Sequence, residues 1–167
     1  MRIYILRHGI AEEVRPGGSD AGRALTEEGK QKLRQVLERA RQAKVAPSLI
    51  LTSPYKRAAE TAEIAAGILG CKAKRVQTSA LLPSSSPLRV WKEVTGALAG
   101  DLMLVGHEPL LSNVAAFLLH CPGLVVDLKK GALVRIDLET PARVPHGVLK
   151  WMLTPKLVGK APADRRS

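Results

Sequence analysis

The sequence is poor in aromatic residues, in cysteine and in long apolar segments. Its 167 residues include only two Trp, two Tyr and one Phe, so it offers few rings on which the bases of single-stranded nucleic acid could stack. No apolar run is long enough to span a bilayer. The first apolar run, four residues before Arg7, is also too short for the core of a secretory signal. We therefore expect a protein that is neither secreted nor inserted in a membrane.

The two cysteines, Cys71 and Cys121, lie far apart and lack the spacing of a metal site. Free thiols of this kind are typical of a reducing compartment. We therefore expect a cytoplasmic protein that uses neither a metal nor another cofactor.

Basic residues outnumber acidic ones, with 26 Lys and Arg against 15 Asp and Glu and a net charge of +11. They are scattered among the acidic residues except in a short C-terminal tail. Such a field favours encounters with anionic substrates or acidic proteins. Because aromatic residues are scarce, we do not expect a nucleic-acid partner. The length and the 46% hydrophobic content indicate one domain, residues 1–155, followed by a basic tail, residues 156–167, that we expect to be frayed.

Short apolar runs alternate with segments of helical periodicity along the chain. This alternation predicts a three-layer α/β domain with a mostly parallel sheet flanked by helices, closed by an antiparallel hairpin. Thr26 is the predicted cap of the first helix, and Ser53 with Pro54 is the predicted start of the second. The expected strands are 3–6, 48–51, 74–78, 101–105, 133–138 and 148–153, and the expected helices are 26–44, 53–70, 90–98 and 110–119.

The tripeptide Arg7-His8-Gly9 directly follows the first predicted strand. Arg7 and His8 should therefore emerge at the carboxyl edge of the sheet, where open α/β sheets bind ligands. Gly9 permits a sharp turn or a close approach of the backbone to a ligand. The arrangement suits an anion held beside a nucleophilic nitrogen. Taken alone, the tripeptide is a weak signal and favours a surface Arg-His pair that ends a strand.

Two further residues, Arg57 and His107, follow other predicted strands within a few residues. If these strands are parallel neighbours, the side chains converge on one pocket with Arg7 and His8. Two guanidiniums can grip the oxygens of a phosphoryl group and neutralise its charge. An unprotonated imidazole can attack phosphorus, and nearby arginines disfavour the imidazolium form of His8. His107 could donate a hydrogen bond to a phosphoryl oxygen.

Other polar residues have simpler interpretations. Asp20 and Arg23 are expected to form an ion pair that fixes their loop, with substrate contact as the alternative. His120 is expected at a helix end, where a cation is favoured, and His146 in a turn.

Three segments, 6–9, 53–61 and 105–109, resemble motifs of the histidine phosphatase superfamily, which has the phosphoglycerate mutase-like fold. The resemblance implies that His8 is the nucleophile, that Arg7 and Arg57 bind phosphate, and that His107 is the second active-site histidine. We expect His107 and Gly9 to contact the phosphate as well. The opening 7–11, the segment 20–29 and the ending 149–155 resemble the short branch of the superfamily, that of bacterial phosphohistidine phosphatases. The resemblance covers nearly the whole chain.

Larger members of the superfamily carry an acid that protonates the departing alkoxide, but the corresponding segment 81–91 has no Asp or Glu. Such help is worth about 10²- to 10⁴-fold in rate. Its absence favours phosphohistidine, whose imidazole leaves more easily. We expect the enzyme to be a monomer and its substrate to be a signalling or phosphotransfer protein that carries phosphohistidine. The short chain has no segment that would cap the pocket, so the pocket should be open enough for a phosphoryl group carried by a protein.

Two other functions remain as alternatives. A small-molecule phosphomonoesterase would need an acid from elsewhere, and Glu12, Glu13 and Glu108 are the candidates. A non-catalytic basic module would bind acidic proteins or nucleic acid in a salt-sensitive way.

Overall fold

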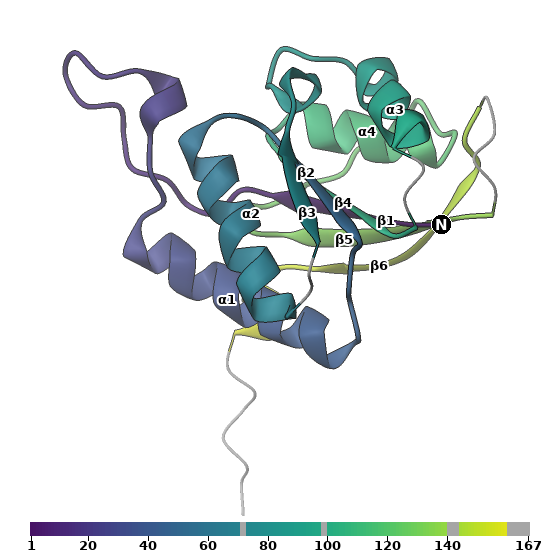
Figure 1. The fold of residues 1–167 in the computed structure, drawn as a ribbon, viewed down its shortest axis with the longest axis horizontal. Coiled ribbons are helices and arrows are strands. Elements are labelled where there is room, and N and C mark those ends of the chain that lie inside the picture. The colour runs from purple at the N-terminus through teal and green to yellow at the C-terminus, as the bar shows by residue number, and fades with distance from the viewer. Residues whose placement is uncertain (71–72, 98–99, 140–143, 160–167) are drawn as a thin grey trace, which may run out of the picture.

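A six-stranded sheet forms the middle layer of the protein in the computed structural model, which describes residues 1–70, 73–97, 100–139 and 144–159 (Figure 1). The strand order is β3-β2-β4-β1-β5-β6. The first four strands in this order run parallel, whereas β5 is antiparallel to β1 and β6 is antiparallel to β5. The strands are β1 Arg2–Arg7, β2 Leu49–Thr52, β3 Lys74–Gln77, β4 Leu102–Gly106, β5 Leu133–Leu138 and β6 Gly147–Leu153. The predicted mostly parallel sheet and its closing hairpin are confirmed.

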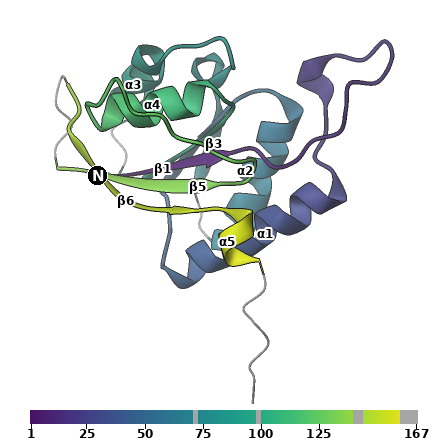
Figure 2. The same ribbon diagram turned by 180° about the vertical axis from the view of Figure 1, so that it is seen from behind.

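Helices cover both faces of the sheet. Figures 1 and 2 show α1, α2 and the short α5 on one side and α3 and α4 on the other. Two short 3₁₀ helices, η1 and η2, lie in the connecting loops. The bounds are α1 Glu27–Gln42, α2 Lys56–Leu69, α3 Pro87–Gly96, α4 Leu110–Leu118, α5 Pro155–Val158, η1 Asp20–Gly22 and η2 Ser79–Leu81. The chain is thus a single α/β domain.

The apolar run of β1 is continuous because both of its faces are buried. Ile3 and Ile5 pack into the cluster formed with α3 and α4, whereas Tyr4 and Leu6 pack into the cluster formed with α1 and α2. Alternate side chains of a strand point to opposite faces, so a strand between two helical layers has no solvent side. This burial fixes β1 in the centre of the sheet.

The carboxyl ends of β1, β2 and β4 meet at one edge. Arg7 of β1 is level with Gly106 of β4, and Thr52 of β2 is level with Val105 of β4. The residues that follow these three strands are therefore neighbours, as the sequence predicted.

Helix α1 begins as expected from its sequence. The side chain of Thr26 accepts a hydrogen bond from Gly29 N at 3.0 Å, and two glutamates occupy the first turn. A Cβ at Gly29 would lie 2.2 Å from the carbonyl oxygen of Ile10. The start of α1 thus lies directly against the loop that follows His8, and only glycine allows that approach.

Three expectations are corrected. Helix α2 begins at Lys56 with Tyr55 as its cap, so Ser53 is not a helix cap; its hydroxyl lies in the site described below. Lys156 and Val158, expected in a frayed tail, belong to α5, which packs beside α1 (Figure 2).

Other expectations fall wholly or partly outside the described residues. The helix expected to reach Leu98 ends at Gly96, and Leu98, Cys71 and residues 160–167 lie outside the described ranges. Cys121 is exposed. None of the described helices is both long and apolar enough to cross a bilayer.

Candidate active site

His8 lies immediately after β1 with its imidazole buried and oriented by the backbone. Its backbone N–H donates to Gly106 O at 3.1 Å, and its side chain is only 6% exposed. Nδ1 lies 2.7 Å from the carbonyl oxygen of Gly9. A carbonyl can only accept, so Nδ1 carries the proton and Nε2 keeps its lone pair. This orientation leaves Nε2 as the nucleophilic atom.

Burial keeps His8 neutral. The pKa of His8 falls from its ordinary value of 6.5 to about 3, chiefly because burial disfavours the charged form. The hydrogen bond to Gly9 opposes this change, and the charges of His107, Arg57 and Arg7 lower the pKa further. The sequence analysis attributed the neutral imidazole of His8 to the nearby arginines, whereas burial is the larger cause.

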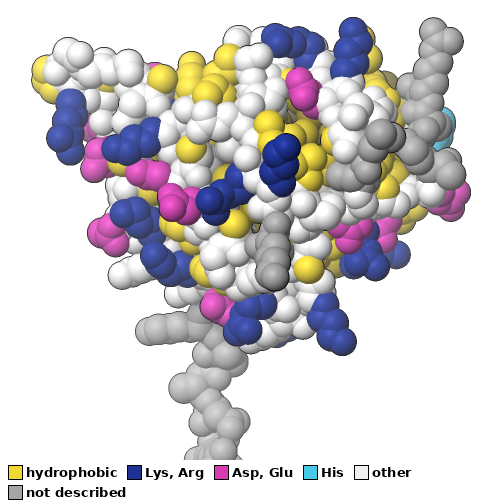
Figure 3. Space-filling view, in the orientation of Figure 1, with side chains coloured by type: hydrophobic (Ala, Val, Ile, Leu, Met, Phe, Trp, Pro, Cys, Tyr) yellow, Lys and Arg dark blue, Asp and Glu magenta, His cyan; other side chains and the backbone are white. Residues whose placement is uncertain are grey.

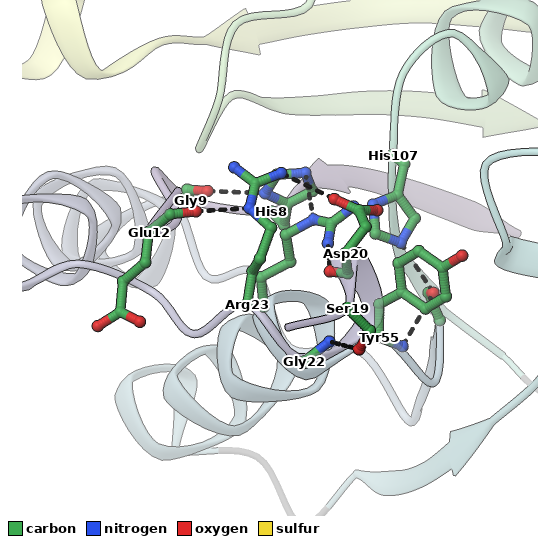
Figure 4. A network of polar contacts seen from close by, with 11 residues as sticks. His8, Gly9, Glu12, Ser19, Asp20, Gly22, Arg23, Tyr55 and His107 are labelled. Carbon is green, nitrogen blue, oxygen red and sulfur yellow. Dashed lines mark hydrogen bonds and ion pairs between the residues drawn. The ribbon is translucent and has the colours of Figure 1, made fainter. Parts of the chain in front are cut away.

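Arg57 lies in the first turn of α2 and contacts both His8 and the loop before α1. Its Nε donates to Nε2 of His8 at 3.2 Å, its Nη1 donates to Asp20 O at 2.6 Å, and its Nη2 donates to Asp20 Oδ2 at 3.0 Å. The partners His8 and Asp20 are labelled in Figure 4. The guanidinium carbon also lies 5.0 Å from the centre of the Tyr55 ring. All three guanidinium nitrogens thus have partners, and one of them covers the lone pair of His8.

Arg7, the last residue of β1, has a buried guanidinium nitrogen without a partner. Its Nη1 donates to Leu128 O at 2.7 Å, but its Nε is buried and has no hydrogen-bond partner among the described residues. Burial also lowers the pKa of Arg7. Buried donors are nearly always paired in native proteins, so this N–H indicates a ligand acceptor.

His107, directly after β4, completes the set. Its ring centre lies 5.0 Å from that of His8, and the side chain is 2% exposed. Nε2 lies 2.8 Å from the hydroxyl oxygen of Ser53, whereas Nδ1 is buried without a partner among the described residues. Burial is the main cause that lowers the pKa of His107 to about 4, followed by the charge of Arg57. His107 is therefore also neutral at pH 7.

Gly9 supports the site rather than offering a free donor to phosphate. Its N–H donates to Thr61 Oγ1 at 3.2 Å, and its carbonyl accepts from His8. A Cβ here would lie 3.3 Å from both Gly29 O and a methyl group of Leu25. The backbone of Gly9 therefore lies close to α1 and the loop before it, where the sequence analysis had considered a close approach to a ligand. Its N–H already donates to Thr61 and is not free to bind phosphate.

Asp20 lies in the site, in contact with Arg57. The sequence analysis had preferred an ion pair with Arg23 that only fixes the loop. Oδ1 of Asp20 accepts from Arg23 at 2.9 Å, as the expected ion pair requires, but its Oδ2 accepts from Arg57. The hydrogen bond from Arg23 is the largest cause of the lowered pKa of Asp20, and Arg57 lowers it further. Asp20 is thus an ionised carboxylate at neutral pH.

None of the three glutamates considered as acids is hydrogen-bonded to the side chain of His8 or His107. Glu108 accepts from Ser112 N at 2.9 Å near the start of α4, where a carboxylate is favoured. Glu12 pairs with Arg15 at 3.4 Å, and Glu13 is exposed. Within the described ranges, no group of three His, Cys, Asp or Glu side chains could hold a metal ion.

His120 and His146 lie away from this site. Their rings stack with centres 4.5 Å apart. His146 directly precedes Gly147, which pairs with Leu138 at the end of the sheet opposite His8.

Comparison with known proteins agrees with this geometry. Residues 3–82 match the model of the histidine phosphatase superfamily, branch 1. An uncharacterised Picosynechococcus protein is 36% identical over 137 residues, which cover 80% of this chain and 83% of the relative. The chain belongs to the histidine phosphatase superfamily.

Within the superfamily, the chain has the short form seen in SixA. It is 25% identical over 159 residues to the phosphohistidine phosphatase SixA of Escherichia coli, covering 93% of this chain and 94% of SixA. The structure of SixA complexed with tungstate superposes with a TM-score of 0.81 at 24% identity, covering 95% of this chain and 99% of that structure. The chain therefore has the SixA-like short form of the histidine phosphatase superfamily.

Proposed function

We propose that the protein is a phosphohistidine phosphatase that forms a covalent phosphoryl intermediate on Nε2 of His8. Nε2 attacks phosphorus, the P–N bond to the substrate imidazole breaks, and that imidazole leaves. Water then attacks phospho-His8, which releases inorganic phosphate and restores the imidazole. Two steps with a good leaving group replace one harder step.

The observation that supports this reaction most is the presence of buried, unpartnered nitrogens around a neutral imidazole. Arg7 Nε and His107 Nδ1 have no partner among the described residues. The centre of the His107 ring lies 5.0 Å from that of His8, and Arg7 is close enough for its charge to lower the pKa of His8. Phosphoryl oxygens would satisfy both nitrogens, and the positive charge of Arg7 and Arg57 would balance the charge that develops on those oxygens. A neutral His8 needs no deprotonation before it attacks.

The state of Asp20 supports phosphohistidine over a phosphate ester. An ester releases an alkoxide that benefits from a general acid. Asp20 is the carboxylate in contact with Arg57, but its two guanidinium partners lower its pKa and so keep it without a proton. An imidazole leaving group depends less on such an acid.

The substrate would be a phosphohistidine-bearing signalling or phosphotransfer protein in the cytoplasm. The net charge of +11 favours approach of an acidic partner. On the face seen in Figure 3, Lys and Arg lie interspersed with Asp and Glu instead of forming one patch, which favours a protein partner over nucleic acid.

The side chains of the site are more enclosed than the sequence suggested. The exposed fraction is 6% for His8, 5% for Arg57 and 2% for His107. The guanidinium of Arg57, held by Asp20, lies where the sequence suggested an open pocket beside His8. Asp20 itself is half exposed. A phosphoryl group entering on the Asp20 side would displace that carboxylate from Arg57.

The test is incubation with a ³²P-phosphohistidine protein, with labelled enzyme trapped by denaturation without acid. The wild type should remove the label and carry it transiently, whereas His8→Ala should do neither. His146→Ala, which removes a histidine at the opposite end of the sheet, is the matched control and should behave as the wild type does.

A parallel assay with a sugar phosphate or p-nitrophenyl phosphate tests the alternative. Hydrolysis of the ester as fast as the phosphohistidine would overturn the substrate but keep the nucleophile. Absence of both activities, with salt-sensitive binding of acidic proteins that survives His8→Ala, would instead indicate the non-catalytic module.

A further inference from the structure

Ser53 has a fully buried hydroxyl that the reaction described above does not use. It follows β2, and its backbone N–H donates to Val105 O of β4 at 3.0 Å. This bond places it beside the end of the strand that leads to His107. Its hydroxyl oxygen has two neighbours, Tyr55 N at 3.3 Å and His107 Nε2 at 2.8 Å.

The two neighbours together determine the direction of the Ser53–His107 hydrogen bond. A hydroxyl has one proton to donate and can accept from others. The N–H of Tyr55 can only donate, so it provides no acceptor for the hydroxyl proton. Nε2 of His107 is the acceptor available to that proton among the described hydrogen bonds.

The opposite direction would leave two buried polar groups without partners instead of one. If Nε2 carried the imidazole proton and donated it to Ser53, neither the hydroxyl proton nor the lone pair of Nδ1 would have a partner among the described residues, whereas the first arrangement leaves only Nδ1–H without one. Each buried polar group without a partner lowers stability, because it has lost its hydrogen bonds to water without replacing them. The arrangement with Nε2 as the acceptor is therefore favoured.

A neutral imidazole carries one N–H, so an acceptor at Nε2 means a donor at Nδ1. Nδ1 of His107 is the atom that is buried without a partner. The ring lies near the rings of His8 and Tyr55, with centres 5.0 Å and 5.1 Å away. The free donor thus belongs to the ring that flanks the nucleophile.

We propose that Ser53 is a positioning residue, whose hydroxyl donates to Nε2 of His107 and holds His107 as the Nδ1–H tautomer, so that Nδ1–H can donate to the transferred phosphoryl group. The role of this donor rests on the proposed phosphatase function, whereas the tautomer is a property of the free protein. Because burial keeps His107 neutral, it cannot present a proton at both nitrogens, and the choice of tautomer decides whether it meets a phosphoryl oxygen with a proton or with a lone pair.

The direct test is ¹⁵N NMR of the histidine side chains at pH 7, with the His107 signals assigned by their loss in His107→Gln. The wild type should show a protonated Nδ1 and an unprotonated Nε2. An Nε2–H tautomer in the wild type would overturn the inference, and this result needs no variant of Ser53 and no substrate.

The variant test compares Ser53→Ala with Thr52→Val. Thr52 is the preceding residue, and its buried hydroxyl donates to the carbonyl of Ser53 without contacting His107, so Thr52→Val is a matched loss of one hydroxyl. Ser53→Ala should populate the Nε2–H tautomer and lower kcat on the phosphohistidine protein at least about tenfold, and at most by the roughly 10²–10³ typical of a lost oxyanion donor. Thr52→Val should keep the wild-type tautomer.

Retention of the pure Nδ1–H tautomer in Ser53→Ala would show that another group fixes the ring, which overturns the role of Ser53. If Ser53→Ala does not fold, Ser53→Cys retains a side chain of similar shape with a weaker donor, and it should show a mixture of tautomers. If NMR shows the Nδ1–H tautomer but the wild type does not turn over phosphohistidine, the assignment of the His107 tautomer stands. Only the proposed phosphatase function is then rejected.

Discussion

Two buried neutral histidines should make the stability of this protein fall steeply as the solution becomes acidic. The folded-state pKa values of His8 and His107 are about 3 and about 4, below the value of 6.5 for an exposed histidine. Between these limits the unfolded chain binds protons that the folded chain does not. Stability from this source is therefore fully present above pH 6.5, and it is lost as the pH falls toward the folded pKa values.

The size of the effect follows from the two pKa values. From pH 7 to pH 5, protonation of the unfolded chain lowers the free energy of unfolding by about 2 kcal/mol for each histidine, because neither folded imidazole takes up an appreciable proton in that range. The pair therefore accounts for about 4 kcal/mol, a large share of the 5–15 kcal/mol that is typical of a domain.

Urea unfolding of the wild type and His8→Asn at pH 7 and pH 5 measures this contribution. His8→Asn should lose about 2 kcal/mol less than the wild type between the two pH values, which is a difference of about 1 M in midpoint at a typical slope. His146→Asn is the control for removing an exposed histidine outside the site. Equal losses in the wild type and His8→Asn would refute the reasoning that burial keeps His8 neutral.

Four further outcomes can be checked with single substitutions. Arg57→Lys should lower kcat on a phosphohistidine protein by about 10²- to 10³-fold, because an ammonium lacks the planar pair of donors with which a guanidinium binds two oxygens at once; unchanged turnover would contradict its role. Gly29→Ala should lower the free energy of unfolding by about 1–3 kcal/mol, since its Cβ would lie 2.2 Å from Ile10 O. Gly67→Ala in α2, with nothing within 4 Å, should raise it by about 0.5–1 kcal/mol in the same urea experiment. Asp20→Ala should strengthen inhibition by inorganic phosphate roughly fivefold, because it removes an anion that competes for a guanidinium; weaker inhibition would instead show that Asp20 only orients that guanidinium.

The sequence predicted the sheet and the position of His8 because both depend on short-range patterns. A continuous apolar run predicts a strand buried on both faces, and β1 is such a strand. The residue after a parallel strand lies at the carboxyl edge whatever the loops do, so His8 and His107 could be placed from the topology. The placement of Arg57 in the same site required only that β2 be a neighbour of β4, and the pairing of these strands confirms it.

The contacts of Ser53 and Asp20 could not be predicted in the same way. Ser-Pro before a helix is typical of a cap, and the sequence therefore indicated a local role for Ser53. Its actual partner, His107, is 54 residues away. Asp20 is three residues from Arg23, which accounts for the ion pair, but its contact with Arg57 depends on how a long loop folds back over α2. Neither of these two long-range contacts can be predicted from a local sequence pattern.

The position of Arg57 links binding of the phosphoryl group to release of the nucleophile in the proposed reaction. In the free protein its Nε donates to Nε2 of His8, so the lone pair that would attack phosphorus is already in use. Its other two nitrogens donate to Asp20. A phosphoryl group offers several oxygens to the same guanidinium and so competes with both partners at once. Because the guanidinium is rigid and planar, turning its donors toward phosphoryl oxygens also removes Nε from His8. The nucleophile is therefore freed by the group that it is to attack.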